Sequence, residues 1–62
     1  MELMELLKDA EEKDIQAQRA HDLWHAGIMP YSEMCSIERA FERAVEDFQL
    51  ASGKHYRLGM SL

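Results

Sequence analysis

Apolar residues in the second half of the chain recur at steps of three and four. They are Met34, Ile37, Phe41, Ala44, Val45, Phe48 and Ala51. This spacing places them on one face of an α-helix, and the charged residues between them fall on the other side. We therefore predict an amphipathic helix over 32–52. It starts with Ser32 as its N-cap or with Pro30 at the first helical position, and it ends before Gly53.

A second apolar pattern predicts a first helix over 2–26. Its apolar residues form two groups on nearly the same face: Leu3, Leu6, Leu7 and Ala10, then Ala17, Ala20, Leu23 and Trp24. Residues 11–14 (EEKD) interrupt this face for a full turn. The segment is either one long helix, supported by an Asp9–Lys13 pair at i, i+4, or two helices with Asp14 capping the second. We favour one helix, because no Gly or Pro marks a break.

The two predicted helices make an all-α hairpin within a single domain, 1–62. A loop over 27–31 (GIMPY) connects them, and Gly27 stands where a left-handed residue is expected to end the first helix. The tail, 53–62, has no periodic pattern. Its Tyr56 and Leu58 are candidates to fold back over the hairpin end.

Two packed helices leave the edges of both apolar stripes in contact with water. Each large side chain left half-exposed forgoes part of the about 1.5–3 kcal/mol that full burial contributes. We expect a homodimer that forms a four-helix bundle to cover these edges, or else a groove on a partner protein. The predicted interface residues are Leu3, Leu7, Trp24, Met34, Ile37, Phe41, Val45 and Phe48. Of these, Phe41, Phe48, Trp24 and the leucines of the first turns are expected to stay partly exposed in the hairpin alone.

Charge narrows the classes of partner. The chain has a net charge of −5, from 12 acidic and 7 basic side chains, which repels nucleic acid and anionic membranes. Lys54 and Arg57 are the local exception, since no acid lies beside them. No apolar run approaches the roughly 20 residues of a membrane span, and the acidic N-terminus is unlike a secretory signal. Cys35 is the single cysteine, so no intrachain disulfide forms. These features predict a soluble, cytoplasmic protein.

Two histidines are the candidate metal ligands. His21 and His25 stand at i, i+4 on one helix face, and Cys35 and His55 are possible further ligands. The sequence HDLWH lacks the glutamate of zinc-protease motifs. We favour the interpretation that both histidines are partly exposed and flank buried Leu23 and Trp24, and we expect no metal and no cofactor.

Two further groups resemble catalytic sites. Cys35 lies in the first turn of the second helix, where a thiol is easily ionised, but catalysis also requires a nearby base and a pocket. A small residue at the margin of the core is the favoured interpretation. The column Glu38, Glu42 and Glu46 is expected to be a solvated face neutralised by Arg39 and Arg43. No enzymatic activity is predicted.

The loop holds the best candidate for a recognition surface. Trp24 is followed by Ile28, Met29 and Tyr31. Apolar residues beside a tryptophan at a loop are either a lid over the core or a hot spot for binding. The lid is favoured.

Two resemblances bear on function. The chain is similar in architecture to the Rop-type plasmid copy-control hairpins, which dimerise and bind paired RNA loops, although it lacks a basic helix face. Ala20, Leu23, Trp24 and Ala26, with Phe41 and Phe48 seven residues apart, resemble motifs of the ANR group and the related PerC-like small regulators. That resemblance implies a homodimer that inhibits transcription activators by direct contact.

We therefore expect a small, acidic, non-enzymatic regulator, adaptor or inhibitor. It acts through helix-face contacts with a transcription regulator or another host protein. The alternatives are a Rop-like nucleic-acid-binding hairpin and a small metal-binding protein that uses His21 and His25.

Overall fold

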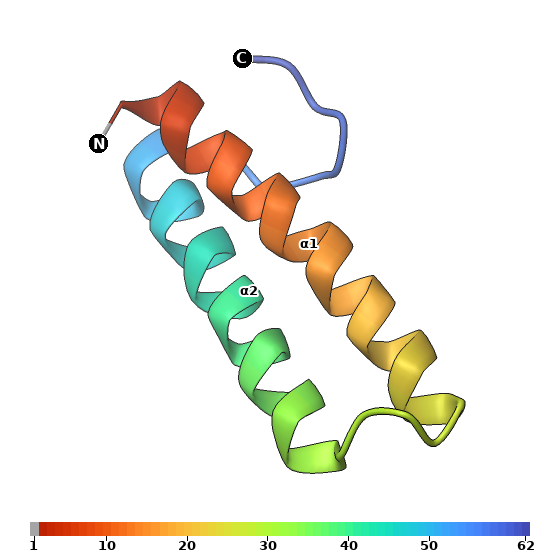
Figure 1. The fold of residues 1–62 in the computed structure, drawn as a ribbon. Helices are drawn as coiled ribbons and strands as arrows, with labels where there is room; N and C mark the ends of the chain where they lie inside the picture. The colour runs from red at the N-terminus through yellow and green to blue at the C-terminus, as the bar shows by residue number, and fades with distance from the viewer. Residues whose placement is uncertain (1) are drawn as a thin grey trace.

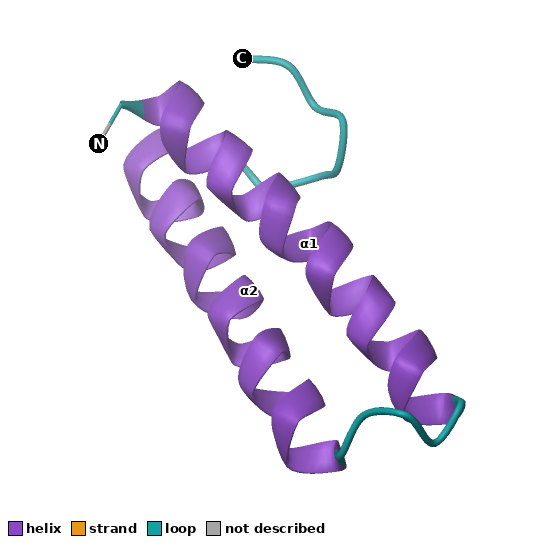
Figure 2. Ribbon diagram, viewed as in Figure 1, coloured by secondary structure: helices purple, strands orange, loops and turns teal. Residues whose placement is uncertain are grey.

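The computed structural model describes residues 2–62 as two antiparallel helices, α1 (Leu3–His25) and α2 (Tyr31–Ser52), followed by an irregular tail (Figures 1 and 2). No strand occurs in this range. The radius of gyration is 12.5 Å, whereas a compact chain of this length has about 10.5 Å. The molecule is thus an elongated pair of helices, and the predicted all-α hairpin is confirmed.

Helix α1 runs without a break through the polar turn at residues 11–14. Two pairs at i, i+4 bridge this turn: Lys13 contacts Asp9, and Gln18 donates a hydrogen bond of 2.9 Å to Asp14. Such pairs add a few tenths of a kcal/mol each, and the turn contains no residue that breaks helices. The prediction of a single helix is confirmed.

Glycines end both helices. Gly27 has φ +76°. The amide of Gly27 donates to the carbonyl of Trp24 at 3.0 Å and that of Ile28 to the carbonyl of Leu23 at 2.9 Å, which is the Schellman pattern. Gly53, with φ +71°, ends α2 in the same left-handed region. Both predicted stops are confirmed.

The start of α2 differs from both predictions. Tyr31 is the first helical residue, and Pro30 precedes it with an extended backbone (φ −64°, ψ 148°). The carbonyl of Pro30 accepts the first helical hydrogen bond, from Met34 at 3.1 Å. Ser32 therefore lies inside the first turn, and its side chain does not cap the helix. The proline ring fixes φ at a value that suits the residue before a helix, so the turn starts without a side-chain cap.

The core between the helices is built mostly from small residues. Its buried members are Leu7, Ala10, Ala17, Ala20, Met34, Ala44 and Phe48. The four alanines let the backbones approach closely, and Phe48 is the one large side chain that is fully buried. Ala51, expected on the same stripe, is exposed because it lies in the last turn of α2, at the end of the hairpin away from the loop.

Candidate protein-binding surfaces

The C-terminal tail folds back into the groove between the helices, where Tyr56 is its anchor. The Tyr56 hydroxyl donates a hydrogen bond of 2.8 Å to Asp14 Oδ2, and its backbone N–H donates one of 3.0 Å to Gln49 Oε1. The ring meets Phe41 and Phe48 edge-on, with centroids 6.0 and 6.4 Å away. This arrangement joins both helices to a residue 42 positions beyond Asp14.

A second tail contact lies about one turn nearer the N-terminus of α1, at Glu11. The backbone N–H of Gly59 donates to Glu11 Oε2 at 2.9 Å, so the tail runs beside the N-terminal half of α1 (Figure 1). Leu58 stays 51% exposed. The expectation that the tail folds back is therefore confirmed for Tyr56 and wrong for Leu58. Burial, and then the hydrogen bond to Asp14, raises the pKa of Tyr56 above its usual range, so the hydroxyl stays protonated.

The tail and the hairpin core change the predicted interface. Leu7, Met34 and Phe48 are buried within the chain itself and present no surface to a partner. The expectation that Phe48 stays partly exposed is wrong, because α1 and Tyr56 enclose it. The other predicted members, Trp24, Ile37, Phe41 and Val45, are half-buried, and Leu3 is exposed.

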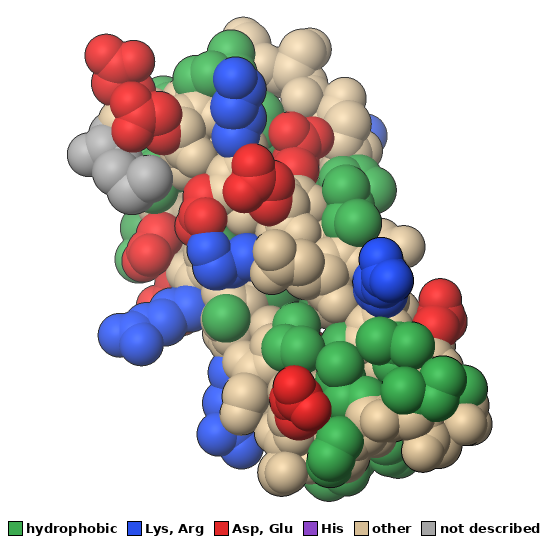
Figure 3. Space-filling model, viewed as in Figure 1, with side chains coloured by type: hydrophobic (Ala, Val, Ile, Leu, Met, Phe, Trp, Pro, Cys, Tyr) green, Lys and Arg blue, Asp and Glu red, His purple; other side chains and the backbone are tan. Residues whose placement is uncertain are grey.

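The end of the hairpin opposite the tail carries an uncovered apolar cluster, here called the loop-end surface: Trp24, Ile28, Met29 and Tyr31. Ile28 is 71% exposed and Tyr31 60% exposed. The Trp24 and Tyr31 rings lie 5.2 Å apart between centroids. Figure 3 shows hydrophobic side chains gathered at this end. The lid interpretation is wrong for Ile28 and Tyr31, since neither side chain covers the core.

The candidate metal ligands His21 and His25 lie one turn apart on α1. His21 Nε2 lies 3.1 Å from a Glu38 carboxylate oxygen across the helix pair, and the His21 and His25 rings are 6.5 Å apart between centroids. Within residues 2–62, no group of three or more potential ligands gathers around one point. Leu23 and Trp24 between the histidines are half-buried. This agrees with the expectation that Trp24 stays partly exposed in the hairpin, and differs from the interpretation that the histidines flank two buried residues.

The groove that holds Tyr56 continues open toward the loop. This part has a volume of about 390 Å³ and is lined by Asp14, Ala17, Gln18, His21, Asp22, Glu38 and Phe41. Asp14 and Phe41 also contact Tyr56, so the filled and open parts are one groove. We call the whole the tail groove. Its lining is acidic over an apolar floor.

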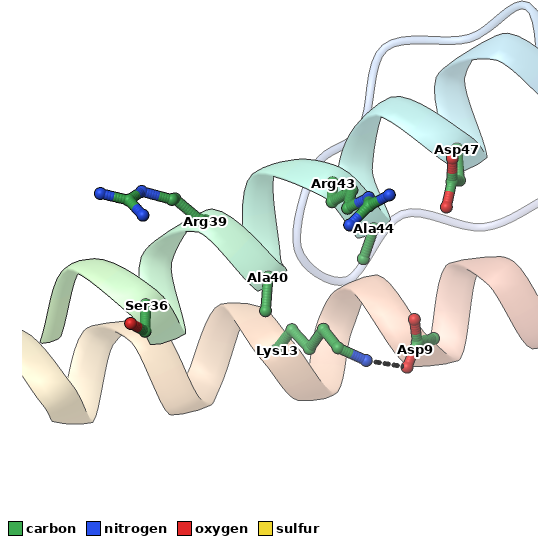
Figure 4. Close-up of a pocket in the computed structure, with 8 residues that line it drawn as sticks. All are labelled: Asp9, Lys13, Ser36, Arg39, Ala40, Arg43, Ala44 and Asp47. Atoms are coloured by element: carbon green, nitrogen blue, oxygen red, sulfur yellow. Dashed lines mark hydrogen bonds and ion pairs between the residues drawn. The ribbon is translucent and has the colours of Figure 1, made fainter. Parts of the chain in front are cut away.

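A different groove, of about 420 Å³, runs between the helices along another face of α2 (Figure 4). It is lined by Asp9, Lys13, Ser36, Arg39, Ala40, Arg43, Ala44 and Asp47. The alanines point toward α1, and the rim carries basic side chains (Lys13, Arg39, Arg43) followed by acidic ones (Asp9, Asp47) toward the end with the termini. In the described part of the chain, neither Arg39 nor Arg43 forms the predicted ion pairs with Glu42 and Glu46. Instead, Glu38 pairs with His21.

Cys35 is half-buried at the start of α2, as expected for a residue at the core margin. Its side chain raises the pKa of the exposed Tyr31 hydroxyl, first by a hydrogen bond and then by charge. Neither interhelical groove described above includes Cys35 in its lining. Cys35 lines a small surface hollow of about 250 Å³ together with Glu38, Arg39 and Glu42.

No protein-family model, curated protein or solved structure matches this chain. The resemblance to the ANR and PerC-like regulators therefore stays a prediction. Over residues 2–62, neither helix has the length and apolar character that crossing a membrane requires.

Proposed function

We propose that the protein is a small non-enzymatic regulator, adaptor or inhibitor that acts by binding another protein through the loop-end surface. The observation that supports this most is the exposure of Ile28 and Tyr31 beside Trp24. Aromatic residues grouped with aliphatic ones are typical of binding hot spots. Covering side chains of this size contributes about 1.5–3 kcal/mol each, which is enough to select for a partner.

The backbone beneath the loop-end surface favours binding. The Schellman turn at Gly27 and the start of α2 at Tyr31 fix both sides of a loop that spans only residues 26–30. A partner therefore meets a loop whose backbone is already ordered, which reduces the entropy lost on binding. The net charge of −5 makes a protein a better partner than nucleic acid or an anionic membrane.

Self-association is the second candidate. Met4 and Ile15 are 51% and 59% exposed. They stand eleven positions apart, which is close to three helical turns, so both lie on one face of α1. A second hairpin packed on this face would complete the four-helix bundle that the sequence predicts, with the chain as a homodimer.

Two measurements test these proposals. The tagged chain is used to capture proteins from its host, in parallel with the double variant Ile28→Asp/Tyr31→Ser and with Leu50→Ser as the matched control, since Leu50 is 77% exposed on α2. The proposal expects a partner that the wild type and the control retain and the double variant loses. Capture that is unchanged in the double variant contradicts the loop-end surface.

Sedimentation velocity of the wild type and of Ile15→Asp tests the second candidate. A dimer that Ile15→Asp converts to a monomer supports the bundle. A wild type that stays monomeric at all concentrations contradicts the four-helix bundle.

A further inference from the structure

The tail groove offers hydrogen-bond acceptors from both helices. Glu11 Oε2, Asp14 Oδ2 and Gln49 Oε1 each accept a hydrogen bond of 2.8–3.0 Å from the tail. Two of the three donors are backbone N–H groups, one from Tyr56 and one from Gly59. Gly59 has φ +81° and lies in a turn that the Met60 N–H closes on the Arg57 carbonyl at 3.2 Å. The third donor is the Tyr56 hydroxyl, so the groove recognises a tyrosine together with the backbone around it.

The tyrosine position is the specific part of this recognition. Phe41 and Phe48 confine the Tyr56 ring by edge-to-face contacts, and Asp14 Oδ2 accepts a hydrogen bond from its hydroxyl. A phenylalanine at this position would fill the same space but leave Asp14 Oδ2 without its donor, while Gln18 still donates to Oδ1. An aliphatic side chain would lose the edge-to-face contacts as well.

The charges of tail and groove are complementary. Lys54, His55 and Arg57 flank Tyr56, and the tail contains no acidic side chain. The groove carries Glu11 and Asp14 where the tail lies. In the open part, Asp22 and Glu38 extend the acidic lining. A basic segment is thus favoured along the whole groove.

The groove is longer than its resident segment. About 390 Å³ remains open beside Asp14 and Phe41, between the tyrosine site and the loop. The tail itself is held by Tyr56 and the Gly59 amide, while Leu58 and Leu62 are 51% and 44% exposed. The tail turns back toward Glu11 after Tyr56, whereas a segment that continues from the tyrosine site toward the loop can fill the open part and so compete with the tail.

We propose that the tail groove is a peptide-binding site that takes a basic segment with a tyrosine anchor from a partner protein. The chain's own tail occupies the site in the free protein and competes with that segment. This site is separate from the loop-end surface, so the two proposals can fail independently.

The test uses full-length Tyr56→Ala, which removes the resident anchor, and a fluorescent peptide with the sequence of residues 53–62. Fluorescence anisotropy is expected to show saturable binding to Tyr56→Ala and at least about tenfold weaker binding to the wild type, because a tethered tail has a high effective concentration. A peptide with Tyr56→Phe is expected to bind several-fold more weakly, and one with Lys54→Glu/Arg57→Glu to lose binding.

Matched substitutions locate the binding site. In the Tyr56→Ala background, Asp14→Asn is expected to weaken peptide binding, whereas Asp47→Asn, in the groove of Figure 4, leaves it unchanged. Equal binding to Tyr56→Ala and the wild type, or no binding to a folded Tyr56→Ala, overturns the proposal. If Tyr56→Ala does not fold, the peptide is instead added in excess to the wild type. It is then expected to shift the NMR amide signals of Asp14 and Gln49, and unchanged signals overturn the proposal.

The wild type also tests which molecule supplies the segment that lies in the groove. Light scattering is expected to give the same molecular mass for the wild type and Tyr56→Ala, because the tail lies in the groove of its own chain. A dimer that Tyr56→Ala dissociates would show that the groove takes the tail of a second copy, which overturns the assignment to a partner protein.

Discussion

The two ends of the hairpin differ in how far their aromatic and apolar side chains are covered. Toward the end that carries both termini, Tyr56 packs on Phe48 and on Phe41, which lies near the middle of α2, and Phe48 is fully buried. At the loop end, Ile28 and Tyr31 remain 71% and 60% exposed beside Trp24. Both regions pack aromatic side chains at the edges of a two-helix layer, but only one has a further segment of the chain to cover them.

Because of this difference, we expect the covered end to stabilise the fold and the loop end to bind a partner. The covered end combines the largest buried side chain with hydrogen bonds that tie the tail to both helices, so it contributes most to the free energy of unfolding. The loop end lacks such a cover, and its apolar side chains contribute little to the folded chain alone. Substitutions at the covered end should therefore lower the free energy of unfolding, whereas those at the loop end should affect binding.

The largest expected effect comes from Phe48→Ala. Removing a fully buried aromatic ring typically costs about 3–5 kcal/mol, and a small domain has only about 5 kcal/mol of stability in total. Urea unfolding followed by circular dichroism should show a variant that retains at most about 2 kcal/mol of stability and unfolds at low urea concentrations. Ile28→Ala is the matched control at the loop end and should change stability by less than about 0.5 kcal/mol. Equal losses in the two variants would contradict the comparison.

A smaller effect is expected where the loop begins. Gly27→Ala places a side chain at φ +76°, a left-handed conformation that costs about 1–2 kcal/mol for residues other than glycine. Nothing lies within 4 Å of the added Cβ, so the loss comes from the backbone alone. The measurement is the urea midpoint, with exposed Lys8→Ala as the control. A variant as stable as the control would mean that the loop can adopt another turn.

The helices could be predicted from the sequence because their signals are local. The spacing of Met34, Phe41 and Phe48 predicts α2, and Gly27 and Gly53 predict the two stops. The start of α2 was misplaced because Ser32 is a favourable N-cap, whereas the structure lets Pro30 precede the first turn without a side-chain cap.

The tail groove could not be predicted in this way. Its contacts join Tyr56 to Asp14 and Gly59 to Glu11, across 42 and 48 positions, and no periodic pattern reports such pairs. The available signals were a tyrosine and two basic residues after an acidic hairpin. Likewise, the exposure of Ile28 depends on the turn geometry, so an apolar loop alone could not distinguish a lid from a binding surface.

Tyr56→Phe should have a still smaller effect, at the covered end. The variant keeps the ring contacts with Phe41 and Phe48 but loses the hydrogen bond to Asp14, which contributes about 0.5–1.5 kcal/mol. Urea unfolding at pH 7 measures this loss. Tyr31→Phe is the matched control, because its hydroxyl lies at the exposed loop end. A loss in Tyr31→Phe equal to that in Tyr56→Phe would show that the tail contact adds no stability.

The pH dependence of these two variants makes the finest distinction between the ends. The pKa of Tyr56 is raised in the folded protein by burial and by the Asp14 hydrogen bond, so folding favours the protonated hydroxyl. Its contribution is therefore complete below the unfolded pKa of about 10 and falls as the pH rises above that value. The stability of the wild type should decrease relative to Tyr56→Phe between about pH 9 and pH 11.5.

The same titration at the loop end should show a smaller decrease relative to Tyr31→Phe. The pKa of Tyr31 is also raised, by Cys35, but solvent screens the interactions of an exposed hydroxyl. Urea midpoints of the three proteins across this pH range give both differences, and lysine titration cancels between them. If the wild type and Tyr56→Phe lost stability in parallel, the Tyr56 hydroxyl would be solvated in solution, and the tail would not close the end of the hairpin that buries Phe48.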